Sequence, residues 1–399
     1  MAVTPETTRS PFPIPLFILL ESLILLGYAL RPSWYRPLLF IPIPFIVYHL
    51  VFHTTTGTIA DVGLGSTLVI HFFFAFDRLV LTDIQKTFHR IGEKPGEITS
   101  ASFLDRLAWS LHLHCSPRGV GWNFEVPHIP KNPPSPDGPG KRKAYVVSRL
   151  GTVLICAAVQ GASMIINSAN PALVPGTIPL HNQPLYVRVL SILGLGAPGL
   201  AYLNLQHCVV GILLVGSGIS EPEDWPPLFG SLSGMYSVQN FWRNVWHQML
   251  RRIFLSTANF IIHTVLRFPH GTSSKSSLPI GLLKLHTVFL VSGIIHYAGE
   301  FMMLGYGGNG ALLFFVVQAW AITLEVVVRY LITESTRANA SEKPPTGIRR
   351  LLGYVWVFCW FVAVTPLIQQ PMVEAGLFLG HENSALAQKV GRWLGLDVI

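Results

Sequence analysis

Long apolar runs recur along this chain, and they restrict the folds that it can adopt. A helix needs roughly 20 apolar residues to cross a hydrocarbon core about 30 Å thick, and several runs reach that length. The predicted membrane-spanning segments lie near residues 13–30, 36–53, 61–82, 145–167, 186–216, 280–304, 309–332 and 350–370, with a shorter candidate at 253–268. We therefore predict an all-α, polytopic integral membrane protein with about eight or nine transmembrane helices.

The composition supports a membrane protein. Of the 399 residues, 50% are hydrophobic and only 12% are charged, whereas about 25% are charged in a typical soluble domain. The mean hydropathy is +0.46. The formal net charge of +8 comes from basic residues that lie mostly between the predicted spans. The positive-inside rule accounts for that placement, so we expect a lipid bilayer as partner and no nucleic acid.

The distribution of Lys and Arg predicts how the chain is oriented in the membrane. Loops 54–60 and 168–185 contain neither residue. The basic TGIRR at 346–350 obeys the positive-inside rule only if the segment 253–268 does not cross the bilayer. The segments predicted to be cytoplasmic are 31–36, 83–144 and 217–252.

The same pattern divides the chain into three parts. Residues 1–82 form an N-terminal three-helix transmembrane segment, and residues 83–144 form a cytoplasmic loop that ends in a Pro/Gly-rich linker. Residues 145–399 form the larger membrane core.

The segment FWRNVWHQMLRR at 241–252 is amphipathic if it is wound as a helix at about 100° per residue. One side then carries Asn240, Arg243, Asn244, His247 and Arg251. The other side carries Trp242, Val245, Trp246, Met249 and Ile253. An interfacial helix explains the tryptophans and arginines, and it remains an alternative to a functional site.

A second histidine lies deep within a predicted span. His296 shares one helical stripe with Ser292 and Glu300, and Gly293 and Gly299 beside it would allow a neighbouring helix or a substrate to come close. Ionisable groups at membrane depth are costly and indicate a functional site. Glu300 could orient the imidazole and raise its basicity, as suits a general base. The alternative is a His/Glu pair that only links helices.

Three ordered motifs together resemble a known family. They are SPRGVGWNFEV at 116–126, WPPLFGSLSGMYSVQNFWRNVWHQMLRR at 225–252 and VSGIIHYAGE at 291–300. They resemble the wax-synthase-like branch of the membrane-bound O-acyltransferase superfamily, closest to the fungal members that acetylate terpenoid and meroterpenoid alcohols. The resemblance covers roughly residues 105–370.

The resemblance implies acyl transfer from acyl-CoA to a hydroxyl, with His296 as the base on a membrane-buried helix. A second polar residue, often Asn in the superfamily, ends the F-W-x-x-x-W segment, and here it is His247. In the mechanism that we expect, Glu300 holds the His296 ring, and His247 or Asn240 polarises the thioester oxygen.

The donor is expected to be acetyl-CoA, used as a substrate, with no permanently bound cofactor. Arg243, Arg251 and Arg252 are predicted to meet its phosphates from the cytosolic side, because guanidinium groups bind phosphate bidentately. Trp246 is assigned to the same donor site. The predicted acceptor is a hydrophobic terpenoid or meroterpenoid alcohol, and the predicted location is the endoplasmic reticulum membrane.

Other functions fit less well. A long-chain acyl-CoA wax-ester or sterol acyltransferase is the first alternative, and a transporter with a buried His/Glu pair is the second. No aspartate-rich Mg²⁺ motif of a prenyltransferase occurs, and GSLSG at 230–234 lacks the central serine of an esterase.

The remaining histidines are given no role in the site. His112 and His114 in LHLHC, with Cys115, match no common zinc spacing, and the four cysteines are scattered. His71 and His286 are interpreted as packing residues. We therefore expect no metal site.

Overall fold

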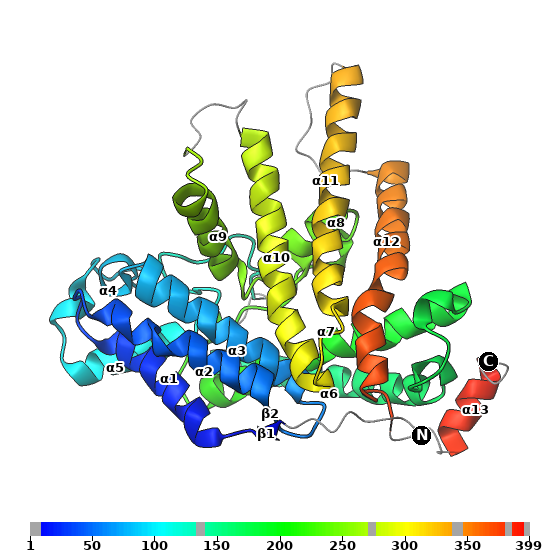
Figure 1. Ribbon diagram of the computed structural model, residues 1–399, viewed down its shortest axis with the longest axis horizontal. Helices are drawn as coiled ribbons and strands as arrows, with labels where there is room; N and C mark the ends of the chain where they lie inside the picture. The colour runs from blue at the N-terminus through cyan, green and yellow to red at the C-terminus, as the bar shows by residue number, and fades with distance from the viewer. Residues whose placement is uncertain (1–8, 133–139, 270–276, 337–345, 380–384, 395–399) are drawn as a thin grey trace. The chain divides into compact units, whose positions relative to one another are not determined.

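The computed structural model describes residues 9–132, 140–269, 277–336, 346–379 and 385–394 (Figure 1). Nearly all of its regular structure is helical. The two-residue strands β1 (Ser10–Pro11) and β2 (Thr54–Thr55) pair in parallel, with Ser10 opposite Thr54. The prediction of an all-α fold is confirmed. Residues 133–139, within the predicted Pro/Gly-rich linker, lie outside the described residues.

In chain order the α-helices are α1 (Ile14–Ala29), α2 (Pro42–His53), α3 (Asp61–Ala75), α4 (Ile84–Thr87), α5 (Phe103–His114), α6 (Lys141–Ser168), α7 (Leu185–Gly216), α8 (Val238–Asn240), α9 (Arg251–Asn259), α10 (Ser277–Leu304), α11 (Gly310–Thr336), α12 (Gly347–Glu374) and α13 (Ala385–Trp393). Eight of them, α1, α2, α3, α6, α7, α10, α11 and α12, correspond to the eight main predicted apolar runs. A π-helical turn at Phe76–Leu81 extends α3.

Seven helical segments of the described chain are long and apolar enough to cross a membrane. They are Arg36–His53, Asp61–Leu81, Lys141–Ser168, Leu185–Gly216, Leu278–Leu304, Gly310–Leu331 and Gly347–Glu374. Helix α1 is apolar but shorter. The candidate at 253–268 is not among the seven, because α9 is a nine-residue helix followed by a six-residue π-helical turn, Phe260–Val265. The chain is an integral, multi-pass membrane protein.

By its internal contacts the chain forms two compact units. The first unit consists of Met1–Pro127 and Met249–Thr323, and the second consists of His128–Gln248 and Leu324–Ile399. Both are discontinuous in sequence, and α11 contributes residues to each. The predicted division at residues 82 and 144 concerns membrane organisation and stays a prediction.

The first unit is built on α1, α2, α3, α5 and α10. Buried residues of its core include Leu20, Leu50, Leu68, Leu113 and Met302. Small residues let α3 and α10 touch at the backbone, so that a Cβ at Gly65 would lie 2.6 Å from the Ala298 carbonyl oxygen.

The second unit is held by polar contacts between its apolar helices. Asn167 Nδ2 of α6 donates to the Gly194 carbonyl of α7 at 2.8 Å, and Gln160 Nε2 donates to the Pro198 carbonyl at 2.7 Å. From α12, Gln369 Nε2 donates to the Ser191 carbonyl at 2.8 Å. Such bonds replace the hydrophobic force that is missing between helices in lipid.

Candidate active site

His296 lies half-buried in α10, within the first unit. Its imidazole stacks on Phe315 of α11, with ring centroids 4.4 Å apart and the planes inclined by 11°. In the described part of the chain this stacking fixes the plane of the ring, while neither ring nitrogen has a hydrogen-bond partner. The nitrogens are thus available to a substrate hydroxyl.

The glycines beside His296 allow close helix packing, as expected. A Cβ at Gly293 would lie 2.8 Å from Leu312 Cδ1 of α11, and one at Gly299 would collide with the Val62 carbonyl oxygen of α3. Helix α10 is therefore clamped between α3 and α11. This packing holds the backbone on either side of the histidine.

Glu300 is 3% exposed, and it caps the start of the neighbouring helix α11. Its carboxylate accepts hydrogen bonds from the backbone N–H groups of Gly310 (3.1 Å) and Ala311 (2.6 Å), at the first turn of α11. A carboxylate at a helix N-terminus is stabilised by the helix dipole and satisfies N–H groups that lack an intrahelical partner. The expected role of Glu300 in orienting His296 stays a prediction beside this capping role.

The F-W-x-x-x-W segment belongs to the second unit, where Glu325 of α11 anchors its start. The Glu325 carboxylate accepts from the backbone N–H groups of Val238 (2.7 Å) and Gln239 (3.0 Å) and from Trp356 Nε1 of α12 (2.7 Å). The Ser237 hydroxyl caps the same end by accepting from the Asn240 N–H at 3.0 Å. The segment is therefore fixed to two membrane helices.

The single amphipathic helix predicted for residues 241–252 is wrong. After α8 the chain forms a π-helical turn, Phe241–Val245, and Trp246 then takes extended backbone angles (φ −69°, ψ 151°). Gln248 stabilises the break, because its Nε2 donates to the carbonyls of Trp242 (2.9 Å) and Trp246 (2.7 Å). Helix α9 begins only at Arg251. His247 and Arg251 consequently do not share a helical face with Asn240 and Arg243.

The predicted residues of this segment have different surroundings. The Asn240 side chain donates to the Gly234 carbonyl and accepts from Asn244 Nδ2. The rings of Trp246 and His247 lie 5.2 Å apart and both contact Phe229. Arg243 is exposed, and no other described residue forms an ion pair or hydrogen bond with its side chain.

Arg251 and Arg252 begin α9 in the first unit, and Arg252 is held by its surroundings. Arg252 Nε donates to Asp77 Oδ2 at 2.9 Å. Its guanidinium lies over the rings of Phe88 (4.3 Å) and Phe124 (5.1 Å). Burial lowers the pKa of Arg252, and Asp77 opposes that shift. The guanidinium that was predicted to bind phosphate is engaged with these groups.

The R-G-x-G-W element, residues 118–122, folds into a tight turn in the same unit. Gly119 and Gly121 have φ angles of 63° and 73°, in the left-handed region that suits glycine. They allow Trp122, 1% exposed, to enter the core against Trp109. Arg118 is also buried, and burial lowers its pKa to about 10. The element thus has a packing role in the first unit.

Glu325 was missed by the sequence analysis, although a signal for it was present. It lies inside a predicted span, and the rule that singled out His296, an ionisable side chain at membrane depth, applies to it equally. Its partners at Val238 and Gln239 are about 87 residues away in sequence, so no local pattern could have revealed them.

Comparison with known proteins identifies the family. The model of the membrane bound O-acyl transferase family matches residues 225–317, a range that includes both His247 and His296. An acetyltransferase of Rhodocybe pseudopiperita is 30% identical to the chain over 361 residues, which cover 89% of the chain and 90% of that protein. The chain belongs to the membrane-bound O-acyltransferase family. It is an acyltransferase enzyme, as the sequence motifs predicted.

Further relatives carry related names. An acetyltransferase of Hericium erinaceus is 28% identical over 93% of the chain and 94% of its own length. An O-mevalon transferase of Penicillium terrestre is 28% identical over 77% of the chain and 72% of its own length. No solved structure matches the chain. Membership of this family removes the case for a transporter.

Proposed function

We propose that the chain transfers an acetyl group from acetyl-CoA to a hydroxyl of a hydrophobic terpenoid or meroterpenoid intermediate, in the endoplasmic reticulum membrane. The observation that carries the proposal is His296, a half-buried imidazole with two available nitrogens on a helix inside the family's matched region. The relatives named acetyltransferase support an acetyl donor.

In the proposed reaction His296 is the general base. A ring nitrogen takes the proton of the substrate hydroxyl as its oxygen attacks the thioester carbonyl carbon. The C–S bond then breaks, and the CoA thiolate leaves and recovers the proton from the imidazolium. His247 or Asn240 is proposed to donate a hydrogen bond to the thioester oxygen as negative charge develops there.

For the donor, we propose that Arg243 binds a CoA phosphate, since this exposed guanidinium is the one not engaged elsewhere among the described donor-site candidates. Arg251 and Trp246 are assigned to the same task. Arg252 is better described as a support, because Asp77 and two aromatic rings hold its guanidinium. The proposal treats acetyl-CoA as a substrate and requires no permanently bound cofactor.

The test is acetyl transfer in microsomes that express the chain, with labelled acetyl-CoA and a panel of terpenoid alcohols. His296→Ala should reduce the rate by at least about 100-fold, the contribution of a general base. His286→Ala is the matched control, because His286 lies on the same helix and bonds Thr323 at 3.0 Å. Retained transfer by His296→Ala would refute the assignment of the base.

The same assay decides the donor. Palmitoyl-CoA with long-chain alcohols or sterols is tested in parallel with acetyl-CoA. Transfer of the long chain alone would replace the proposal with the wax-ester or sterol alternative. The relatives named O-mevalon transferase are a reason to include other short acyl-CoA donors in the panel.

A further inference from the structure

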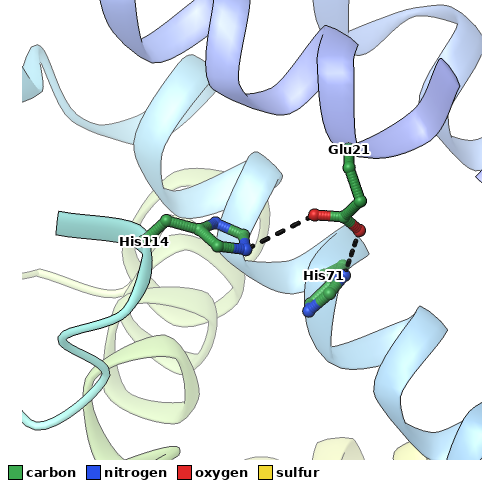
Figure 2. A group of neighbouring side chains, drawn as sticks. All are labelled: Glu21, His71 and His114. Carbon is green, nitrogen blue, oxygen red and sulfur yellow. Dashed lines mark hydrogen bonds and ion pairs between the residues drawn. The ribbon is translucent and has the colours of Figure 1, made fainter. Parts of the chain in front are cut away.

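Three ionisable side chains from distant parts of the chain meet in the first unit (Figure 2). Glu21 comes from α1, His71 from α3 and His114 from the last turn of α5. His71 Nδ1 lies 2.5 Å from Glu21 Oε1, and His114 Nε2 lies 3.4 Å from Glu21 Oε2. The three side chains point toward one another, and one donor atom from each lies within 4.8 Å of the other two.

This donor set suits a transition metal. Two imidazole nitrogens and one carboxylate oxygen are common ligands of Zn²⁺, with bonds of about 2.0–2.2 Å. Tetrahedral ligands at such lengths are about 3.4 Å from one another. The two histidine nitrogens lie 2.5 Å and 3.4 Å from the Glu21 oxygens, and the three donor atoms lie within 4.8 Å of one another, so side-chain rotations would suffice to admit an ion.

The surroundings leave room for a bound cation. His114 Nδ1 is buried and bonds no other described atom, so the polar contact of this ring is directed at Glu21 alone. The side chains are 17% (His71 and His114) and 22% (Glu21) exposed, which leaves a path for an ion and room for a fourth ligand such as water. A cation would also offset the cost of holding the Glu21 carboxylate in an apolar helix.

We propose that Glu21, His71 and His114 bind a structural zinc ion that ties α1, α3 and α5 together. The site is separate from the residues assigned to acyl transfer. Its position matters all the same, because α3 is the helix that packs against α10 at Gly65 and Gly299. The ion would stabilise α3, and α3 in turn packs against α10, the helix that carries His296.

The first test measures the metal directly. The full chain, purified in detergent without chelators, should contain about one zinc ion per chain, as measured by inductively coupled plasma mass spectrometry. A variant with His71→Ala and His114→Ala should lose it. His112→Ala is the matched control, because His112 is exposed on the same helix as His114 and should leave the zinc content unchanged.

A second test does not depend on the variant being well folded. Removing the metal from the unaltered chain with a chelator should lower its unfolding temperature, and adding Zn²⁺ alone should restore it. Co²⁺ added to the stripped chain should produce the visible absorption of a tetrahedral site. Absence of both zinc and a Co²⁺ spectrum in the unaltered chain would overturn the proposal and leave a hydrogen-bonded triad.

Discussion

Glu300 and Glu325 use their carboxylates in the same way, on backbone N–H groups where a helix begins. Glu300 binds the start of α11, and Glu325, on α11 itself, binds the start of α8. A carboxylate offers two oxygens and several lone pairs, so one side chain satisfies two or three donors. At membrane depth this pairing explains how acidic residues are retained in apolar helices.

Glu325→Gln tests the anchoring of the F-W-x-x-x-W segment. The amide offers one acceptor oxygen instead of two, so we expect at least one of the three donors to lose its bond, at a cost of about 1–3 kcal/mol. A displaced segment should reduce acetyl transfer about tenfold or more, because about 1.4 kcal/mol corresponds to a factor of ten. The rate per amount of membrane-inserted protein measures this effect.

Glu374→Gln is the matched control for that experiment. The same Glu-to-Gln change is made there at an exposed position, since Glu374 is the last residue of α12. It should keep full activity. Equal rates for Glu325→Gln and Glu374→Gln would show that the carboxylate of Glu325 does not hold the segment in its working position.

At the residue scale, the sequence predicts single functional residues better than contacts between side chains that are distant in sequence. His296 stands out because it is an ionisable residue within an apolar run, and the structure places it on a long helix as expected. The cluster of Glu21, His71 and His114 could not be predicted, since successive members are 50 and 43 residues apart and match no metal-binding spacing.

At the scale of secondary-structure elements, apolar runs predict helices well. Amphipathic periodicity, in contrast, wrongly predicted one continuous helix over residues 241–252. The period of 3.6 assumes continuous helical hydrogen bonding. Here the side-chain amide of Gln248 bonds two main-chain carbonyls and thereby supports an extended residue at Trp246. Side-chain bonds to the backbone compete with helix formation, and the hydrophobic pattern does not show them.

Gly299→Ala tests the contact between α3 and α10. The added methyl group would collide with the Val62 carbonyl oxygen, which is backbone and cannot rotate away. Overpacking of this kind costs about 1–3 kcal/mol. We expect a lower unfolding temperature in detergent, and reduced transfer as the backbone near His296 shifts.

Gly281→Ala is the control on the same helix, because a Cβ at Gly281 would meet no described atom within 4 Å apart from its chain neighbours and the backbone of its own helical turns. Alanine is favoured over glycine in helices by up to about 1 kcal/mol, so this variant should be as stable as the unaltered chain or more so. If Gly299→Ala unfolded at the same temperature as Gly281→Ala, the close packing of α3 and α10 would be disproved.

At the scale of the whole molecule, the set of seven long helices resolves a conflict in the charge pattern. With the segment 253–268 outside that set, the basic residues at 346–350 come out on the same side as the segments 83–144 and 217–252 that are predicted to be cytoplasmic, as the positive-inside rule requires. The prediction of eight or nine spans is close because hydropathy measures the cost of placing side chains in lipid. It does not separate α9, which is short, from a true span.

Introduced glycosylation sites test this orientation. Pro175→Asn creates the sequon Asn-Gly-Thr in the loop after α6, and we expect it to be glycosylated in the lumen. Glu97→Asn creates Asn-Ile-Thr in the segment predicted to be cytoplasmic, and it should stay unmodified. Both are made with Asn339→Gln, which removes the native sequon Asn339-Ala340-Ser341, and mobility before and after endoglycosidase is compared. The reverse pattern would invert the topology.

The interleaving of the two units sets an order of assembly during synthesis. Helix α3 leaves the ribosome about 200 residues before α10, from Ala75 to Ser277, and residues 128–248 of the other unit are made in between. At a synthesis rate of about 5–20 residues per second, α10, which contacts Gly65, is made about 10 to 40 s after α3. During that interval the face of α3 that carries Gly65 must be covered by lipid or by the translocation machinery. Assembly of the first unit is therefore a late event, completed after most of the chain has been inserted.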